Sequence, residues 1–215
     1  IWDAVRDAVD SSEGETGSFI LTGSSSPSKH LVSHSGAGRI AKLRMRTMSL
    51  AETGESSAAV SLAGLFAGQY KPALVQQRLA PLAETICRGG WPALRNADFN
   101  KASRYLDSYF DALFETSIPR RGLDGSESRR VARSLARNLG TSAKLTTIGA
   151  DAFSDELSTS TIEKRTAEHI AALEALYVIE SVAGWDAPIR SKSRLRTKPK
   201  RYFADPSLAA NLLQV

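Results

Sequence analysis

Several features that usually point to a function are scarce or missing in this sequence of 215 residues. A single cysteine, Cys87, excludes an internal disulfide and fits a reducing compartment. No G-x-x-x-x-G-K-[ST] phosphate-binding loop occurs. No apolar run approaches the ~20 residues of a membrane span, and no signal-peptide pattern is present. We therefore expect a cytoplasmic protein with no membrane contact.

Metal-binding patterns are also missing. His30 and His34 have the i, i+4 spacing of helical ligands, but no cysteine, glutamate or third histidine completes a set, so we expect no metal site. Gly36-x-Gly38-x-x-Ala41 resembles a dinucleotide fingerprint only superficially, because no buried strand precedes it. Cys87 lies in a helical pattern and is predicted to be a core thiol.

Positive charge is what the chain has in excess. It carries 28 Lys and Arg against 23 Asp and Glu, a net charge of +5. This balance is compatible with a polyanion as partner but does not require one. The chain opens at Ile1, inside an amphipathic pattern, and we expect it to be a fragment of a longer protein.

The N-terminal part reads as helix, then strand. Residues 1–9 predict a short helix, and Phe19–Leu21, bounded by glycines, predicts a buried strand. A short helix at 28–33 and a second strand at Ile40–Met45 follow. This order is half of a βαβ unit and places the chain in the α/β class, with helices dominating.

Two residues in this region are candidate phosphate ligands. Thr22 follows the first strand, where ligands of open α/β sheets bind. Its alternative role, capping the next helix, is favoured by spacing alone. Arg39 stands between a glycine and the second strand and could reach a phosphate, although pairing with a surface carboxylate is the simpler role.

The middle of the chain is helical. Met48–Glu52 predicts a helix start, residues 59–67 predict a helix, and 74–86 predict another that Pro81 kinks or splits. Gly89-Gly90-Trp91-Pro92 stops it. Aromatic and leucine residues at spacings of three and four predict a long core helix over 99–116, and 119–125 is a polar linker.

The last part predicts three helices and a two-stranded ribbon. Residues 128–139 form a basic helix with Val131, Leu135 and Leu139 inward, and 145–153 form a second. A capping box, Ser160 to Glu163, starts the third. One strand ends near Trp185, and 201–204 return as the other. This is the winged-helix order, a variant of the helix-turn-helix.

The loop between these strands is the most basic stretch of the chain. From Ile189 to Arg201 it contains no acidic residue. Such density favours salt-sensitive, sequence-independent binding to phosphates. A solvated hairpin, or a face that docks an acidic protein partner, is the alternative. The third helix favours base recognition less, because Glu163 and Glu168 dilute its positive charge. The basic candidates are Arg190, Lys192, Arg194, Arg196, Lys198, Lys200 and Arg201.

Several short motifs in order resemble a known family. They are Phe19-Ile20-Leu21-Thr22-Gly23-Ser24, Ala37-Gly38-Arg39-Ile40, Met48-Ser49-Leu50-x-Glu52, Arg88-Gly89-Gly90-x-Pro92, and Lys198-x-x-Arg201-Tyr202-Phe203-x-Asp205-Pro206-x-Leu208-Ala209. The set resembles prokaryotic AAA-type ATPases in which the ATPase core precedes a winged-helix domain and a nuclease-like domain.

The resemblance implies a function for the parent protein and a limit for this chain. Thr22 matches the sensor position of the nucleotide site, and Arg39 matches the family's Gly-Arg, a phosphate-proximal or inter-subunit arginine. The phosphate-binding loop and the acidic pair that holds magnesium are missing from this sequence. ATP and Mg are thus expected in the full-length parent, and this chain alone should not hydrolyse ATP.

These inferences combine into one predicted architecture. Residues 1–72 are the C-terminal part of a P-loop-type α/β core, 73–125 a helical lid or connector, and 126–215 a winged-helix domain. DNA is a candidate partner, and so is a second copy of the chain. A DNA-binding regulator and a protein-interaction module are the alternative functions.

Overall fold

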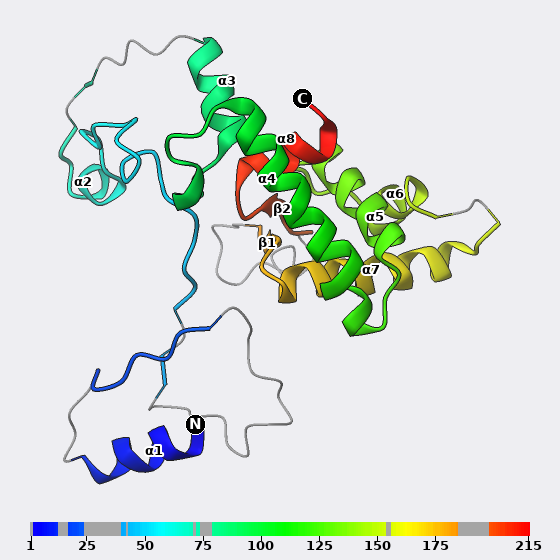
Figure 1. Cartoon of the computed structure of the whole chain (residues 1–215), viewed down its shortest axis with the longest axis horizontal. Coiled ribbons are helices and arrows are strands. Elements are labelled where there is room, and N and C mark those ends of the chain that lie inside the picture. Colours follow the sequence, from blue (N-terminus) through cyan, green and yellow to red (C-terminus); the bar gives the residue numbers. More distant parts are fainter. Residues whose placement is uncertain are drawn as a thin grey trace. The chain divides into compact units, whose positions relative to one another are not determined.

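The computed structural model describes residues 2–12, 17–23, 40–41, 43–70, 72–73, 79–153, 156–184 and 198–215 (Figure 1). The chain divides into two compact units, unit 1 (Ile1–Met45) and unit 2 (Arg46–Val215). Helices dominate the described residues, and their one sheet has two strands. The helix-rich α/β class is confirmed at this coarse level.

Unit 1 contains the predicted N-terminal helix but not the predicted strands. Helix α1 spans Trp2–Ser11. Phe19 and Ile20 are 48% and 87% exposed and Leu43 is 97% exposed, and no strand forms among the described residues of this unit. The buried strands at 19–21 and 40–45 were therefore wrong. A strand needs the hydrogen bonds and side chains of a neighbour, and the described part of unit 1 offers none. The helix predicted at 28–33 lies outside the described residues.

Unit 2 begins with a segment, residues 46–55, that we call the strap. It contains a single helical turn closed by a capping box. The Ser49 N–H donates to Glu52 Oε2 at 2.7 Å, and the Glu52 N–H donates to Ser49 Oγ at 3.4 Å. The helix start predicted at Met48–Glu52 is thus one turn long, because residues 55–60 leave the helical conformation.

Two helices follow the strap. Helix α2 (Leu62–Phe66) is a shortened form of the helix predicted at 59–67 and buries none of its side chains. Helix α3 spans Leu79–Arg88, and Pro81 lies in its first turn. The helix continues past Pro81 to Arg88, and the kink or split predicted at Pro81 depends on residues 74–78 and stays a prediction. Residues 74–78 lie outside the described residues.

The remaining elements form a helical body with one ribbon. In chain order they are η1 (Pro92–Leu94), α4 (Phe99–Ala112), the π-helical turn η2 (Leu113–Ser117), η3 (Pro119–Arg121), α5 (Gly125–Arg137), α6 (Leu145–Ala150), α7 (Thr159–Ala175), β1 (Ile179–Val182), β2 (Lys200–Phe203) and α8 (Pro206–Leu213). The long helix predicted over 99–116 and the three helices before the ribbon are confirmed, with α7 capped by Ser158, two residues before the predicted Ser160.

A single hydrophobic core joins α4, η2, α5, α6, α7, the ribbon and α8, as their grouping in Figure 1 suggests. Phe110 and Phe114 stack with their ring centroids 5.6 Å apart. Val131 and Leu135 are buried as predicted, but Leu139 is 43% exposed. Leu139 lies beyond the end of α5, where the chain turns toward Gly140, so it leaves the inward face.

The ribbon is antiparallel and is attached to the helices along both strands. Ile179 pairs with Phe203, and Val182 pairs with Lys200. The Gly140 N–H donates to the Arg201 carbonyl at 2.9 Å, so the turn after α5 lies along the free edge of β2. The Val178 N–H, just before β1, donates to the Leu173 carbonyl of α7 at 3.0 Å. These bonds fix the ribbon to the end of α5 and the end of α7.

In the described segments, every helix is too short or too polar to cross a membrane. The domain boundaries predicted after residues 72 and 125 stay predictions. The core nevertheless takes side chains from both sides of residue 125, with Phe110 before it and Val131 after it.

Candidate functional site

The described residues do not form a nucleotide site around Thr22 and Arg39, the two residues predicted to contact the phosphates. Thr22 is exposed, and it follows an exposed stretch without regular secondary structure instead of a buried strand. Arg39 lies outside the described residues. The role of both residues in a nucleotide site stays a prediction.

The basic segment is held at one end of the ribbon. Val182, the last residue of β1, pairs with Lys200, the first residue of β2, so residues 183–199 connect the two strands at that end. Lys198 and Lys200 are exposed at the C-terminal base of this connection. The other predicted basic ligands of the connection lie outside the described residues: Arg190, Lys192, Arg194 and Arg196.

Arg201 has a different position from the other basic candidates. Its guanidinium is half-buried, and Nη1 donates to the Ala143 carbonyl at 3.1 Å. Burial lowers the pKa of the Arg201 side chain, and Glu174 partly opposes this. Because its guanidinium binds the backbone between α5 and α6, Arg201 fixes the ribbon to the helices. Its predicted contact with nucleic acid is untested.

The exposed face of α7 is not basic. Glu163, Lys164 and Glu168 are exposed on it, whereas Arg165 is turned toward α5 and bonds Glu127. One positive charge against two negative charges gives this face a net charge of −1. It offers phosphates no attraction, as the sequence indicated.

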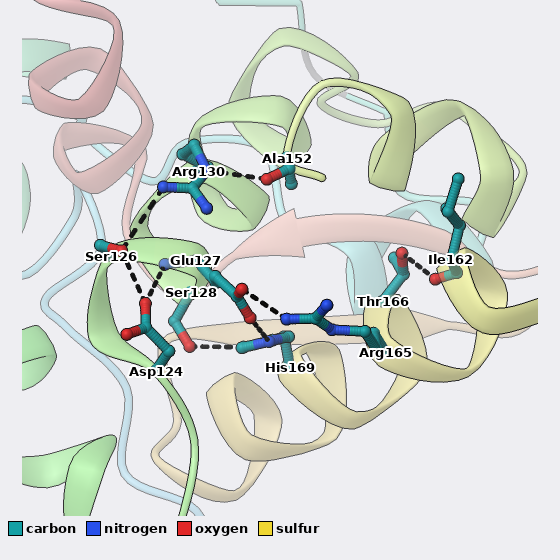
Figure 2. A network of polar contacts seen from close by, with 10 residues as sticks. All are labelled: Asp124, Ser126, Glu127, Ser128, Arg130, Ala152, Ile162, Arg165, Thr166 and His169. Carbon is teal, nitrogen blue, oxygen red and sulfur yellow. Dashed lines mark hydrogen bonds and ion pairs between the residues drawn. The ribbon is translucent and has the colours of Figure 1, made fainter. Parts of the chain in front are cut away.

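Behind that face lies a buried polar network between α5 and α7 (Figure 2). His169 is 2% exposed and points from α7 toward the first turn of α5. Its Nδ1 lies 2.6 Å from Ser128 Oγ, and its Nε2 lies 3.3 Å from Glu127 Oε2. A neutral ring with its proton on Nε2 satisfies both contacts, because the Ser128 hydroxyl donates to Nδ1 while Nε2–H donates to Glu127.

These residues include a serine, a histidine and a glutamate, but they do not form a hydrolytic site. Ser128 is 0% exposed, so no substrate carbonyl can reach its Oγ. Its hydroxyl is also used as a donor to His169. The Glu127 carboxylate is shared with Arg165, whose guanidinium lies 4.7 Å from the centroid of the Phe153 ring. The network therefore holds α5 against α7.

The network predicts a pH dependence of stability. Burial lowers the pKa of His169 below its usual value; Glu127 and Asp124 oppose this shift, and Arg165 adds to it. Protonation thus costs more in the folded state than in the unfolded state. The part of the unfolding free energy that depends on neutral His169 is fully present above about pH 6.5, the ordinary histidine pKa. It is lost as the pH falls through the lower pKa of His169 in the folded state.

We expect the free energy of unfolding, measured by urea titration, to fall between about pH 7 and pH 5. His169→Gln should remove part of this slope and lower stability at pH 8. His30→Gln/His34→Gln, which changes the other two histidines of the chain, is the matched control. An unchanged slope in His169→Gln, or an equal change in the control, would contradict the assignment.

A second buried polar contact joins distant parts of unit 2, and we call it the joint. Asp205, 1% exposed, caps α8 by accepting the Ser207 N–H at 2.9 Å. The same carboxylate accepts the Gly90 N–H at 2.9 Å. Trp91 Nε1 donates to Ser207 Oγ at 3.0 Å. The Gly89–Trp91 corner after α3 is therefore bound to the start of α8.

The strap is bound to the same corner. The Met48 N–H donates to the Gly90 carbonyl at 2.7 Å, and Arg88 pairs with Glu55. At the other end of the strap, Arg46 Nη2 donates to Glu180 Oε2 of β1 at 2.8 Å. A pocket of about 230 Å³ lies between the strap, α3 and the joint. The short motifs at 48–52 and 88–92 thus meet the Asp205-Pro206 part of the motif at 198–209.

Two glycines with positive φ allow the joint to be tested. A Cβ on Gly89, whose φ is +70°, would lie 2.1 Å from Asp205 Oδ1, whereas Gly122, at +77°, has nothing within 4 Å. Gly122→Ala should cost about 1–2 kcal/mol of unfolding free energy from backbone strain. Gly89→Ala should cost about 1–3 kcal/mol more, because it also displaces the buried carboxylate. Denaturant titration checks this, and equal losses would argue against the joint.

Sequence reasoning missed Asp205, Glu127 and His169. Asp205-Pro206-Ser207 before an apolar run is a helix-start signal that could have identified Asp205 as a cap. Nothing in the sequence indicates that His169 meets Glu127. Cys87, predicted in the core, is half-buried, and its Sγ lies 3.7 Å from the Val215 carbonyl. Over the described ranges, no three His, Cys, Asp or Glu side chains could hold a metal ion.

Comparison with known proteins identifies one family. No curated protein matches the chain, and no solved structure does. Residues 80–215, more than half of the chain, match a family model described as "Domain of unknown function (DUF8612)". The matched region begins in α3 and contains the joint, the polar network and the ribbon. The chain therefore belongs to the DUF8612 family.

Proposed function

We propose that α5, α6, α7, β1 and β2 form a winged-helix domain that binds nucleic acid through its phosphates. We further propose that the domain belongs to the C-terminal part of an AAA-type ATPase-like protein of the cytoplasm. The activity of this chain is then binding, and ATP hydrolysis requires the longer parent.

One observation carries the binding proposal. Three packed helices are followed by an antiparallel ribbon. Val182 and Lys200 are the last paired residues of this ribbon, and the basic connection joins the strands beyond them. The connection and the residues just after it contain seven Lys and Arg between Ile189 and Arg201 and no acidic residue. A ribbon with a basic connection is suited to neutralise phosphates along a duplex.

The contacts should be sequence-independent. Base recognition needs side chains that reach base edges, and in a helix-turn-helix these come from the recognition helix. The corresponding helix here, α7, exposes two glutamates and one lysine over residues 163–168. We therefore propose attraction to the phosphate backbone without base readout.

The ATPase part of the proposal is supported by the joint. The motifs at 48–52 and 88–92 meet the Asp205-Pro206 part of the motif at 198–209 at one place in unit 2. Motifs that contact one another in the folded chain are expected to occur together in one sequence, as these do. In the parent, Thr22 and Arg39 would act on ATP and Mg, with the phosphate-binding loop and the acidic pair supplied by segments that this sequence does not contain.

A protein partner is the second candidate. It is favoured by the net negative face of α7, which repels phosphates and could bind a basic surface. The same experiment separates the two candidates, because only the first predicts steep salt dependence with a plain duplex.

The full chain should bind a 20-base-pair duplex with an affinity that falls steeply as salt rises from 50 to 200 mM. Fluorescence anisotropy measures this. The slope of log K against log salt changes by about 0.9 for each phosphate contact. Arg194→Ala/Arg196→Ala should therefore make the slope shallower by about 2 and weaken binding similarly for all sequences.

The matched control is Arg120→Ala/Arg121→Ala. These arginines are exposed in η3, and the change removes the same two charges away from the ribbon. It should leave the slope nearly unchanged. No binding at 50 mM salt, or equal losses in both variants, would remove nucleic acid as the partner.

A further inference from the structure

We propose that unit 2 carries a second binding site, a groove between α4, α5 and α8 that takes a small amphiphilic anion. The ligand class is a carboxylate or phosphate attached to an apolar body. This site does not depend on the winged-helix proposal, because none of its residues belongs to the ribbon or to α7.

The groove has the size and lining of a small-molecule site. Its volume is about 740 Å³. Sites for small ligands typically measure about 300–1,000 Å³ and combine an apolar lining with a few polar groups. The apolar surface open to a ligand comes mainly from the exposed Phe99 ring, and the buried side chains of Leu106, Phe114 and Leu212 lie beneath the groove.

One wall of the groove is a row of arginines on α5. Arg129, Arg130 and Arg133 all line it and are exposed. The Arg130 guanidinium is held in place, because Nε donates to the Ala152 carbonyl at 2.7 Å. Arg133 makes no hydrogen bond or ion pair with the described residues. The Arg130 guanidinium is thus fixed in this wall, and the Arg133 guanidinium beside it has no partner among the described residues.

Arg129 can exchange its present partner for a ligand. It pairs with Asp111 at 2.9 Å, but both side chains are about half exposed, and such surface pairs contribute little. Its guanidinium carbon lies 4.9 Å from the centroid of the Phe114 ring. The positive charge therefore stands directly beside the apolar lining. A ligand with an anionic group next to an apolar group would contact both.

The carboxylates of the groove limit where an anion can bind. Asp107 and Glu115 line the α4 and η2 side, so three arginines against two acids leave a net charge of +1. Asp107 already accepts the Asn211 Nδ2–H at 3.1 Å. An anion should therefore bind at the α5 wall, with its apolar body against the exposed Phe99 ring and the edge of Leu212. A polyanion such as nucleic acid would meet both carboxylates, and this favours a small ligand.

The test uses 8-anilinonaphthalene-1-sulfonate, a fluorescent aromatic anion, on the full chain. Decanoate and decanol have the same apolar chain, but only decanoate is an anion. Decanoate should therefore displace part of the bound probe, and decanol should not displace that part. Arg129→Ala/Arg133→Ala should weaken the decanoate-displaceable binding about tenfold, as expected for the loss of charge-assisted hydrogen bonds. Phe99→Ala should weaken probe binding while decanoate still competes.

The matched control is Arg120→Ala/Arg121→Ala, which removes two exposed arginines outside the groove. Its decanoate-displaceable binding should equal that of the unchanged chain. All variants change exposed side chains, and equal thermal unfolding temperatures verify their folding. Equal displacement by decanol, or equal affinity in the Arg129→Ala/Arg133→Ala variant and the control, would overturn the proposal.

Discussion

The buried carboxylate of Asp205 is the interaction on which the arrangement of unit 2 depends. A charge away from water is tolerated only when hydrogen bonds satisfy it, and this one accepts from Gly90 N, Ser207 N and Ser207 Oγ. Asp205 stands two residues after the end of β2 and directly before α8. The same group therefore sets the start of α8 and holds the corner that follows α3.

This constraint gives the strap a fixed place. The Met48 N–H bonds the Gly90 carbonyl, and a Cβ on Gly90 would lie 2.1 Å from the Met48 carbonyl oxygen. Only glycine permits that approach. The strap is the segment through which the chain enters unit 2, and Arg46 connects it to β1.

The network around His169 and the hydrophobic core keep the three helices before the ribbon in register. The two proposed binding surfaces lie outside this core, where lysine and arginine side chains are exposed. The basic connection joins the ends of β1 and β2, and the α5 arginines line the groove. The first proposal rests on charge alone, whereas the second combines charge with apolar contact, so the two proposals call for different ligands.

The helices and the ribbon could be predicted from local pattern. Apolar residues at spacings of three and four identified α4, α5 and α7, and the ribbon strands followed from short apolar runs on either side of a basic loop. The runs at 19–21 and 40–45 have the same local appearance, but strand formation depends on a neighbour that local pattern does not reveal.

The contacts of the candidate site could not be predicted from the sequence, because they join residues that lie far apart in the chain. Asp205 meets Gly90 across 115 residues, and His169 meets Ser128 across 41. No periodicity encodes such pairs. The groove was missed because its lining comes from α3, α4, η2, α5 and α8 together, whereas the arginines of α5 were visible only as one basic helix.

Amide hydrogen exchange at Gly90 tests the central claim most directly. Its N–H is buried and bonds only the Asp205 carboxylate among the described residues, so its exchange reports on the joint. The account predicts that this amide exchanges as slowly as the amides of the buried core of α8, because both should open only when unit 2 unfolds. Exchange at the rate of an unstructured peptide, while α8 stays protected, would show that the corner and α8 are not joined.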